Sequence, residues 1–379
     1  MKKGKFTLVF LGIICLLVLI ALPLLTACAS PAPATTKAPA PTTTAPQAPA
    51  TSTAPASSPA AAPAQIFNIK FASWNPEVAP VSQTQKKWGA NLEQQSGGRI
   101  KVTYYFGESL AKQNDLFRAA QTNVADVVHF PMTDITLYPL NMVVYLPFIG
   151  VPSATEGTAI WWKLYNQFPA MQKELEGVKV LAATLTPGSQ LSTTKKAVST
   201  PADIKGMKIL CRGLWADAMK GMNAAPVEQP ASDWYTSLDR GLAEGIIMHF
   251  PGLVNFKLLD MLKYHSMFGA GCQFSPTPIA ISAKTFNSMP ADLQKIVLDS
   301  GKWMENEILV SDTKQEQDNI AQAKQKGNTF TNVSGADAKA WSDAVKPVID
   351  KWIADNTAKG APAQAIYDEC IKQIGQIAK

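Results

Sequence analysis

The stretch that decides the fold is Pro80–Phe106, PVSQTQKKWGANLEQQSGGRIKVTYYF. In its first part apolar side chains, Trp88 and Leu92 among them, recur at helical spacing, which predicts a helix. Ser96-Gly97-Gly98 ends this helix, because glycine readily adopts the backbone conformations found at helix C-termini. Residues 100–106 are rich in β-branched and aromatic side chains, which favour a strand. The stretch therefore reads as a helix, a tight turn and a strand.

The same alternation continues on both sides of this stretch. Residues 66–72 alternate apolar and polar side chains and predict a strand before the helix. The pattern predicts further strands at 124–130, 178–184 and 208–211, and helices at 114–121, 158–176, 215–221 and 232–240. After Pro290 the sequence is helical almost to its end, with one long or two abutting helices at 291–326 and others at 336–356 and 362–377. Strands alternating with helices predict an α/β fold with mostly parallel sheets.

The composition from Ile66 onward argues against several classes of protein. This part is long enough for two domains. The whole chain has 35 Lys and Arg against 29 Asp and Glu. Without the three lysines at its start, 32 basic residues remain against 29 acidic ones, and a net charge of +3 is too weak to indicate a nucleic-acid partner. Cys211, Cys272 and Cys370 are odd in number and scattered, so they suggest neither a disulfide framework nor a zinc site. We expect them to be buried as apolar side chains.

Residues with catalytic chemistry are scarce. The three histidines, His129, His249 and His265, form no pair with metal-ligand spacing. The sequence has no nucleophile elbow and no phosphate-binding loop. We therefore expect no metal, no cofactor and no catalytic residue.

The first 65 residues indicate where the rest of the chain works. A basic start is followed by an apolar run, Phe6–Leu25, and by small residues leading to Cys28, which is the layout of a secretory signal peptide. The cysteine makes the segment resemble a bacterial lipoprotein signal, whereas the length of the apolar run also suits an uncut transmembrane anchor. Residues 29–64 are almost entirely Ala, Pro, Thr and Ser. They cannot build a core, and we expect an extended linker.

Five segments, taken in order, carry a resemblance to a known family. They are SGGRIKV (96–102) with GESL (107–110), ADVV (125–128) with LPF (146–148), PADIKGMKI (201–209), WYTSLDRG (234–241) with EG (244–245), and MPADLQKI (289–296). Together they span most of residues 66–301. Their order and spacing resemble the solute-binding proteins of tripartite ATP-independent periplasmic (TRAP) transporters, the DctP-like family.

The resemblance implies a two-lobed α/β fold like that of periplasmic binding proteins, with a cleft between the lobes, hinge strands and a long helix in the C-terminal region. It implies a signal peptide at 1–27, a lipidated Cys28 with a linker to residue 65, and a solute-binding domain at 66–379. Lobe I would take about 66–188 and 276–315, and lobe II about 189–275 and 316–379. The protein would sit outside the cytoplasm, lipid-anchored to the outer face of the cytoplasmic membrane, and deliver a small organic acid or related solute to the TRAP permease subunits.

The resemblance also directs attention to one arginine. Family members usually have an arginine that grips the solute's carboxylate where this chain has Leu210. The next arginine is Arg212, and residues two apart on a strand share a face, so Arg212 could reach the cleft or could be solvated. A guanidinium suits the role because its fork matches two carboxylate oxygens. His249 could donate to an anion or be a packed core histidine.

Aromatic residues are the other site candidates, each weighed against simple core packing. Trp74, His129 and Phe130 follow predicted strands, where open α/β sheets bind ligands. The remaining candidates are Trp215, Trp234, Tyr235, Phe250 and Phe274. Leu210 and the stretch from Met248 to Phe250 favour a solute that is less acidic, bulkier or more apolar than a small dicarboxylate. The alternatives are a binding lipoprotein for a sensor or another transporter type, and an extracytoplasmic enzyme.

Overall fold

The computed structural model describes residues 65–377. The expectations for the signal peptide, Cys28 and almost all of the linker lie outside these residues. Within the described range, no helix is long and apolar enough to cross a membrane.

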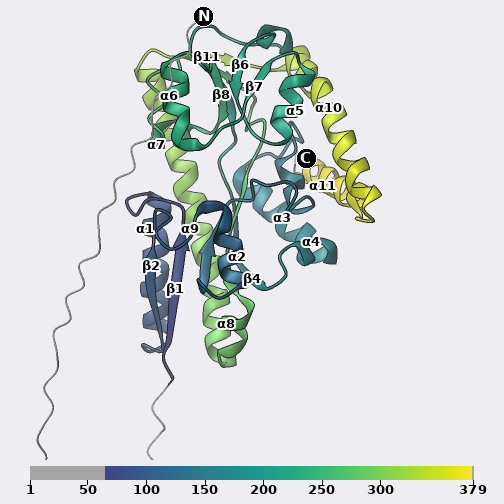
Figure 1. The fold of residues 1–379 in the computed structure, drawn as a ribbon. Coiled ribbons are helices and arrows are strands. Elements are labelled where there is room, and N and C mark those ends of the chain that lie inside the picture. The colour runs from purple at the N-terminus through teal and green to yellow at the C-terminus, as the bar shows by residue number, and fades with distance from the viewer. Residues whose placement is uncertain (1–64, 378–379) are drawn as a thin grey trace, which may run out of the picture. The chain divides into compact units, whose positions relative to one another are not determined.

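The described chain is built on two β-sheets (Figure 1). We call the part on the five-stranded sheet lobe I. Its strand order is β2-β1-β3-β10-β4, with β1 at Phe67–Ser73, β2 at Ile100–Tyr105, β3 at Val127–His129, β4 at Val178–Leu185 and β10 at Pro276–Ser282. We call the part on the six-stranded sheet lobe II. Its order is β11-β9-β5-β8-β6-β7, with β5 at Gln190–Thr193, β6 at Lys208–Leu210, β7 at Ala225–Val227, β8 at Gly245–Met248, β9 at Tyr264–Met267 and β11 at Thr329–Asn332.

Helices cover the sheets. They are α1 Pro80–Gln95, α2 Leu116–Gln121, α3 Ala154–Gln167, α4 Pro169–Glu174, α5 Leu214–Gly221, α6 Trp234–Asp239, α7 Phe250–Asn255, α8 Ala283–Ser288, α9 Ala291–Gln325, α10 Gly335–Ala358 and α11 Ala363–Ile377. Short 3-10 helices lie at η1 Gln113–Asp115, η2 Asn141–Tyr145, η3 Pro201–Ile204 and η4 Ala231–Asp233. The long helix α9 is continuous. It packs on α1 and β4 of lobe I and on α7 of lobe II, so it runs along both lobes.

The helix–turn–strand unit predicted from Pro80–Phe106 is confirmed. Trp88 and Leu92 of α1 are fully buried against the sheet. Gly97 and Gly98 have φ of 62° and 80°, which turns the chain into β2, and β2 pairs in parallel with β1. The predicted helix over 158–176 is wrong as a single helix. It breaks into α3 and α4 because Phe168 precedes Pro169 and takes an extended conformation.

The prediction of mostly parallel sheets is corrected to mixed sheets. β10 runs antiparallel to β3 and β4, and β5 runs antiparallel to β8 and β9. Both exceptions are strands by which the chain enters a lobe from the other lobe. An incoming strand must run away from the boundary between the lobes, whereas the other strands of these antiparallel pairs run towards it. As a result β1, β3, β4, β6, β8 and β9 all end near the boundary.

Two chain segments cross between the lobes side by side. Residues 186–189 connect β4 to β5, and residues 268–275 connect β9 to β10. They are joined by backbone hydrogen bonds, from Ser189 N to Gln273 O (2.9 Å) and from Cys272 N to Ser189 O (2.8 Å). At the crossing, a Cβ on Gly188 would lie only 1.8 Å from the Ala270 carbonyl oxygen. The two backbones therefore touch, and only glycine fits at this point.

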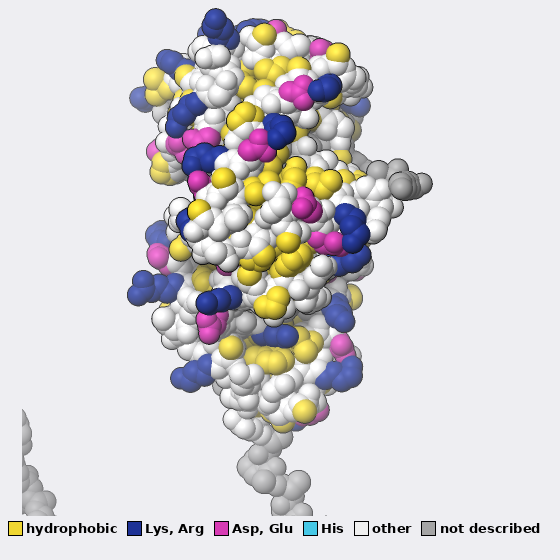
Figure 2. Space-filling model, turned by 90° about the vertical axis from the view of Figure 1, so that its right-hand side faces the viewer, with side chains coloured by type: hydrophobic (Ala, Val, Ile, Leu, Met, Phe, Trp, Pro, Cys, Tyr) yellow, Lys and Arg dark blue, Asp and Glu magenta, His cyan; other side chains and the backbone are white. Residues whose placement is uncertain are grey.

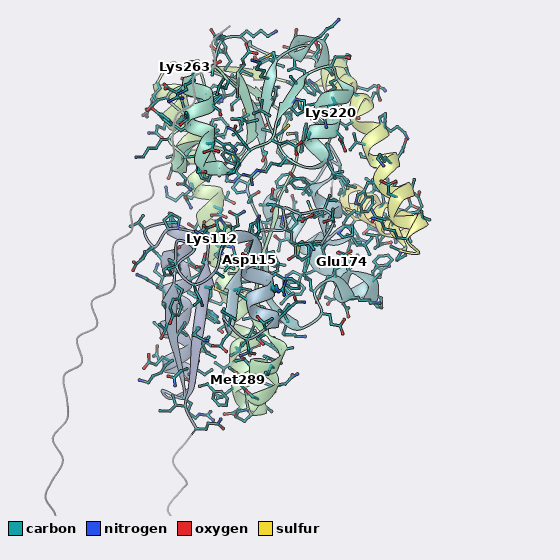
Figure 3. The ribbon with its side chains drawn as sticks, viewed as in Figure 1. Lys112, Asp115, Glu174, Lys220, Lys263 and Met289 are labelled. Atoms are coloured by element: carbon teal, nitrogen blue, oxygen red, sulfur yellow. The ribbon has the colours of Figure 1, made fainter. Side chains whose placement is uncertain are left out.

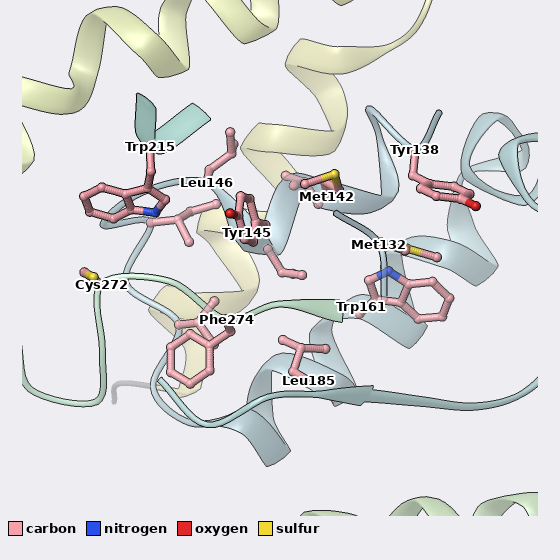
Figure 4. Packing of buried hydrophobic residues seen from close by; sticks show 14 of the residues in the cluster. Met132, Tyr138, Met142, Tyr145, Leu146, Trp161, Leu185, Trp215, Cys272 and Phe274 are labelled. Atoms are coloured by element: carbon pink, nitrogen blue, oxygen red, sulfur yellow. The ribbon is translucent and has the colours of Figure 1, made fainter. Parts of the chain in front are cut away.

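The largest hydrophobic cluster extends through both lobes. It joins residues of lobe I, such as Leu146 and Leu185, to Ile209 and Trp215 of lobe II (Figure 4). Helix α11 contributes Ile366 and Cys370 to this cluster. We expected the whole of 316–379 in lobe II, but α11 packs on α3 and η2 of lobe I, while α10 packs on α5 of lobe II. The buried side chains of α11, such as Ile366 and Cys370, therefore pack on lobe I, across the boundary from α10.

Helix α10 carries its charges on its outer face. Lys339, Lys346 and Lys351 each pair with the aspartate four residues later. Figure 2, which shows the side of the molecule where α10 and α11 lie, has both charge signs interspersed over the surface. Such exposed pairs contribute little to stability because water and salt screen them, so the fold rests on its buried contacts.

We predict that Gly188→Ala destabilises the protein. The new methyl group meets backbone atoms of Ala270 and Gly271, which cannot move without parting the two crossing segments. Overpacking of this kind costs about 1–3 kcal/mol of the free energy of unfolding, measurable by thermal or urea unfolding. Gly375→Ala is the matched control, because Gly375 lies in α11 with no atom near its Cβ position. That change should be neutral or stabilising, and equal losses for both variants would contradict the prediction.

Candidate functional site

Two adjoining cavities lie between the lobes, and together we call them the cleft. The inner cavity has a volume of about 180 Å³ and the outer cavity about 770 Å³. They share five lining residues, Gln113, Pro131, Thr133, Arg212 and Ala231. The inner cavity lies where the strands end: Trp74 follows β1, Arg212 follows β6 and His249 follows β8. This is the edge at which α/β sheets bind ligands.

Arg212 occupies the junction between the two cavities. Its guanidinium carbon lies 4.9 Å from the centre of the Trp234 ring, and its Nη2 donates to the Gln229 carbonyl oxygen (3.1 Å). Burial lowers the pKa of Arg212 from its ordinary value, but arginine stays charged in proteins. Leu210, the last residue of β6, and Cys211 line the inner cavity beside it, so the chain follows the cavity wall after the strand has ended. The guanidinium is therefore held by one carbonyl and one aromatic face, at a position where Arg212 lines both cavities.

Three tryptophans line the inner cavity: Trp74, Trp215 and Trp234. His129 lies behind Trp74, with ring centres 4.3 Å apart, and does not line either cavity. Its Nδ1 accepts a hydrogen bond from Gln85 Nε2 (2.8 Å). Burial lowers the pKa of His129 to about 3, so the ring is neutral at physiological pH. His129 thus supports the Trp74 ring from behind.

His249 lines the inner cavity and also caps a helix. Its Nδ1 accepts a hydrogen bond from the backbone N–H of Gly252 (3.1 Å) at the start of α7. Burial lowers the pKa of His249 to about 4. The neutral ring therefore carries its proton on Nε2, since Nδ1 acts as an acceptor. Next to it, Glu316 of α9 accepts from Phe250 N (3.2 Å), and burial raises the pKa of Glu316 to about 8.

The structure places the other candidate residues away from the inner cavity. Phe130 lines the outer cavity, where it packs with Phe117 and Tyr138. Tyr235 lines a separate pocket of about 310 Å³ on lobe II. Phe250 stacks on Phe330 and packs at a tilt against His265 in the lobe II core, and Phe274 is buried in the largest cluster. An aromatic side chain next to a strand end can face either the sheet core or the cleft, which the sequence pattern did not separate.

Sequence reasoning missed the polar wall of the inner cavity. The two crossing segments and the start of β10 supply Thr186, Ser189, Gln273, Ser275 and Thr277, and η2 supplies Tyr145. The signal for them was the pair of glycines with polar neighbours, Gly188-Ser189 and Gly271-Cys272-Gln273. Cys211, Cys272 and Cys370 are free and buried, as expected. Between residues 65 and 377 no three His, Cys, Asp or Glu side chains gather as possible metal ligands.

The outer cavity carries several acidic side chains on its lining. Asp115 and Asp134 of lobe I and Glu228 of lobe II are exposed and form what we call the acidic rim. Figure 3 shows Lys112 and Asp115 at the end of lobe I that faces lobe II. Lys112 pairs with Glu108 (3.2 Å).

Two lobes joined by crossing segments, with a cleft at the ends of their strands, define the α/β class of solute-binding proteins. The family model DctP, described as bacterial extracellular solute-binding protein, family 7, matches residues 71–356, and the chain belongs to this family. It is thus an extracellular solute-binding protein by family.

Two solved structures superpose on this fold, and one characterised relative matches the sequence. A marine metagenome TRAP solute-binding protein specific for aromatic acid ligands, solved with 3-hydroxybenzoate, superposes with a TM-score of 0.75 at 21% identity, over 83% of this chain and 100% of that one. A Bordetella bronchiseptica TRAP protein with bound mandelate gives a TM-score of 0.72 at 21% identity, over 82% and 99%. The 2,3-diketo-L-gulonate-binding periplasmic protein of Escherichia coli is 21% identical over 287 residues, 75% of this chain and 86% of its own.

We predict that His129 makes stability depend on pH. Its pKa is 6.5 when unfolded and about 3 when folded, so the unfolded state binds more protons between these values. The stabilisation is complete above pH 6.5 and is lost as the pH falls. Between pH 7 and pH 5 the loss is about 2 kcal/mol.

His129→Asn isolates this contribution because it keeps an acceptor for Gln85. The wild type should lose more stability than the variant between pH 7 and pH 5, as measured by urea unfolding. Burial raises the pKa of Asp312 to about 7 and that of Glu316 to about 8, so these two groups make the free energy of unfolding larger as the pH falls. Both proteins contain them, so their effect cancels when wild type and variant are compared. If the free energy of unfolding depends on pH identically in the wild type and in His129→Asn, the prediction is contradicted.

Proposed function

We propose that this protein is the extracytoplasmic receptor of a TRAP transporter and that it captures an apolar monocarboxylic acid, most simply an aromatic one, for delivery to the membrane permease subunits. The observation that carries the proposal is Arg212. Two basic side chains line the cleft, Lys112 and Arg212. Among the described residues, Arg212 has no carboxylate within ion-pair distance. A half-buried, charged guanidinium with free donors is a receptor for one carboxylate.

The charges around Arg212 favour one carboxylate over two. The other basic residue of the cleft, Lys112, is already paired with Glu108. The acidic rim of Asp115, Asp134 and Glu228 surrounds the outer cavity, where the far end of a longer solute would lie. A second carboxylate there would meet like charges, which disfavours small dicarboxylates.

The walls of the inner cavity favour an apolar body on the solute. Trp74, Trp215 and Trp234 face it together with Ile247 and Met248. Its volume of about 180 Å³ lies below the roughly 300–1,000 Å³ of pockets for drug-sized ligands, which suits a small molecule. Two proteins with the same fold are described with 3-hydroxybenzoate and with mandelate, both aromatic monocarboxylic acids.

The proposal extends to the N-terminal part of the chain. A diacylglycerol on Cys28 would hold the protein at the outer face of the membrane, and the Pro-rich stretch up to residue 65 would give it reach. The receptor would then stay close to its permease while its lobes capture solute.

We predict that Arg212→Gln weakens binding of aromatic monocarboxylates, such as benzoate and mandelate, by about 10- to 100-fold in calorimetric titration, because a charge-assisted hydrogen bond is lost. Arg212→Lys should keep part of the affinity, since the ammonium keeps the charge but not the fork. Arg240→Gln is the control, because it removes the same charge from an exposed residue at the end of α6. Succinate should bind more weakly than benzoate.

Two results would contradict this account. One is tight binding of a small dicarboxylate that Arg212→Gln leaves unchanged. The other is equal weakening by Arg240→Gln, which would point to a general charge effect and not to a contact.

We also predict that Cys28→Ser moves the protein from the membrane fraction to the soluble extracytoplasmic fraction in cell fractionation. Removal of the only acceptor for the lipid would leave no anchor after signal cleavage. A variant that stays in the membrane fraction would favour an uncut hydrophobic anchor over lipidation.

A further inference from the structure

We infer that Gln229 and Ser237 of lobe II are positioning residues of the cleft, and that together they set the orientation in which the Arg212 guanidinium meets a carboxylate. The inference rests on the proposed function and concerns how its anion receptor is held. It comes from the carbonyl oxygen of Gln229, which accepts hydrogen bonds from Arg212 Nη2 (3.1 Å) and from Trp234 Nε1 (3.2 Å). A carbonyl oxygen has two lone pairs, so it can serve both donors at once.

The shared carbonyl oxygen fixes the guanidinium together with the face of the Trp234 ring. The guanidinium carbon of Arg212 lies 4.9 Å from the centre of that ring, and the indole N–H donates to the same oxygen as Arg212 does. Trp234 is itself buried, and its ring meets Phe256 edge-on with ring centres 5.0 Å apart. The Gln229 carbonyl and the Trp234 ring therefore form one cradle for the guanidinium.

The side chain of Gln229 holds that carbonyl oxygen in place. Gln229 lies in the connection 228–230 between β7 and η4, outside any strand or helix. Its Nε2 donates a hydrogen bond to Ser237 Oγ in α6, the helix that begins with Trp234. Ser237 is 3% exposed and lines neither cavity. The hydrogen bond folds the connection back onto α6, so Ser237 acts on Arg212 through Gln229.

An arginine that is held before the solute arrives binds a carboxylate more tightly than a mobile arginine does. A mobile side chain must be ordered when the solute binds, and arginine has many rotamers to lose. That ordering weakens affinity by about 2- to 10-fold for each immobilised side chain. The match between the guanidinium fork and two carboxylate oxygens also depends on the orientation of the fork. The contact between Gln229 and Ser237 therefore orders Arg212 when the protein folds, before any solute is bound.

The test uses benzoate or mandelate, whichever binds the wild type more tightly. Binding is measured by the rise in unfolding temperature with acid concentration, because this rise also reports weak binding. Ser237→Ala and Gln229→Met each remove the side-chain hydrogen bond and keep the Gln229 carbonyl, and each should weaken binding of the acid by about 2- to 10-fold. The double variant should bind no more weakly than the weaker of the two single variants, because both changes remove the same hydrogen bond.

Ser300→Ala is the matched control. Ser300 is also 3% exposed and lies in a helix, and its Oγ also accepts from a side-chain N–H, that of Trp88 (2.9 Å), far from the cleft in lobe I. This change should lower stability and leave the affinity unchanged. A second arm repeats Ser237→Ala in the Arg212→Gln protein, where it should have no further effect on affinity, which a merely structural role would not produce. If Ser237→Ala does not fold, Gln229→Met takes its place in both arms.

The outcomes separate this inference from the proposed function. If Arg212→Gln weakens binding but Ser237→Ala and Gln229→Met bind the acid as the wild type does, the inference is overturned and the receptor function stands. The inference is also overturned if Ser300→Ala weakens binding equally, or if Ser237→Ala weakens it as much in the Arg212→Gln protein as in the wild type. If neither acid binds, or if Arg212→Gln changes nothing, the proposed function fails and the inference fails with it.

Discussion

The arrangement of the two lobes depends on the close contact between Gly188 and residues 270–271. At this crossing the backbones of two connecting segments touch, and the hydrogen bonds around Ser189 bind them together. Because no side chain separates the segments, the sheets they come from are brought close enough to enclose an inner cavity. The same segments supply the polar wall of that cavity, so the contact that joins the lobes also builds part of the site.

The direction of the strands explains why distant residues meet. Each lobe receives an incoming strand, β10 or β5, which runs away from the boundary, and the strands that pair with it in antiparallel fashion run towards the boundary. Trp74, Arg212 and His249 follow three strands that end there and gather around one cavity. Their surroundings are fixed from behind, by His129 under the Trp74 ring and by the start of α7 bound to His249. Most of the site is therefore held in place by the fold itself.

Local patterns in the sequence predicted local structure well. The helix–turn–strand unit around Gly97 and the long helix after Pro290 follow from spacing and glycine chemistry alone. The antiparallel strand β10 was missed because its partners β3 and β4 are distant in the sequence, and the docking of α11 on lobe I was missed because it depends on contacts made across the boundary. For the site, Arg212 and Trp74 could be proposed from strand ends and resemblance. Gln273 was missed, although the glycines with polar neighbours at 188–189 and 271–273 carried a signal for it.

The position of Arg212 at the junction of the cavities sets an order of events. Under the proposed function, an arriving organic anion would pass the acidic rim of Asp115, Asp134 and Glu228 before it meets the guanidinium. Exposed charges at such an entrance act mainly on the association rate and its dependence on ionic strength. Capture of a monoanion should therefore be fastest when salt screens the rim, and a dianion is slowed at the entrance before any contact in the inner cavity is formed. The proposed receptor would therefore select its solute partly by association rate and partly by affinity.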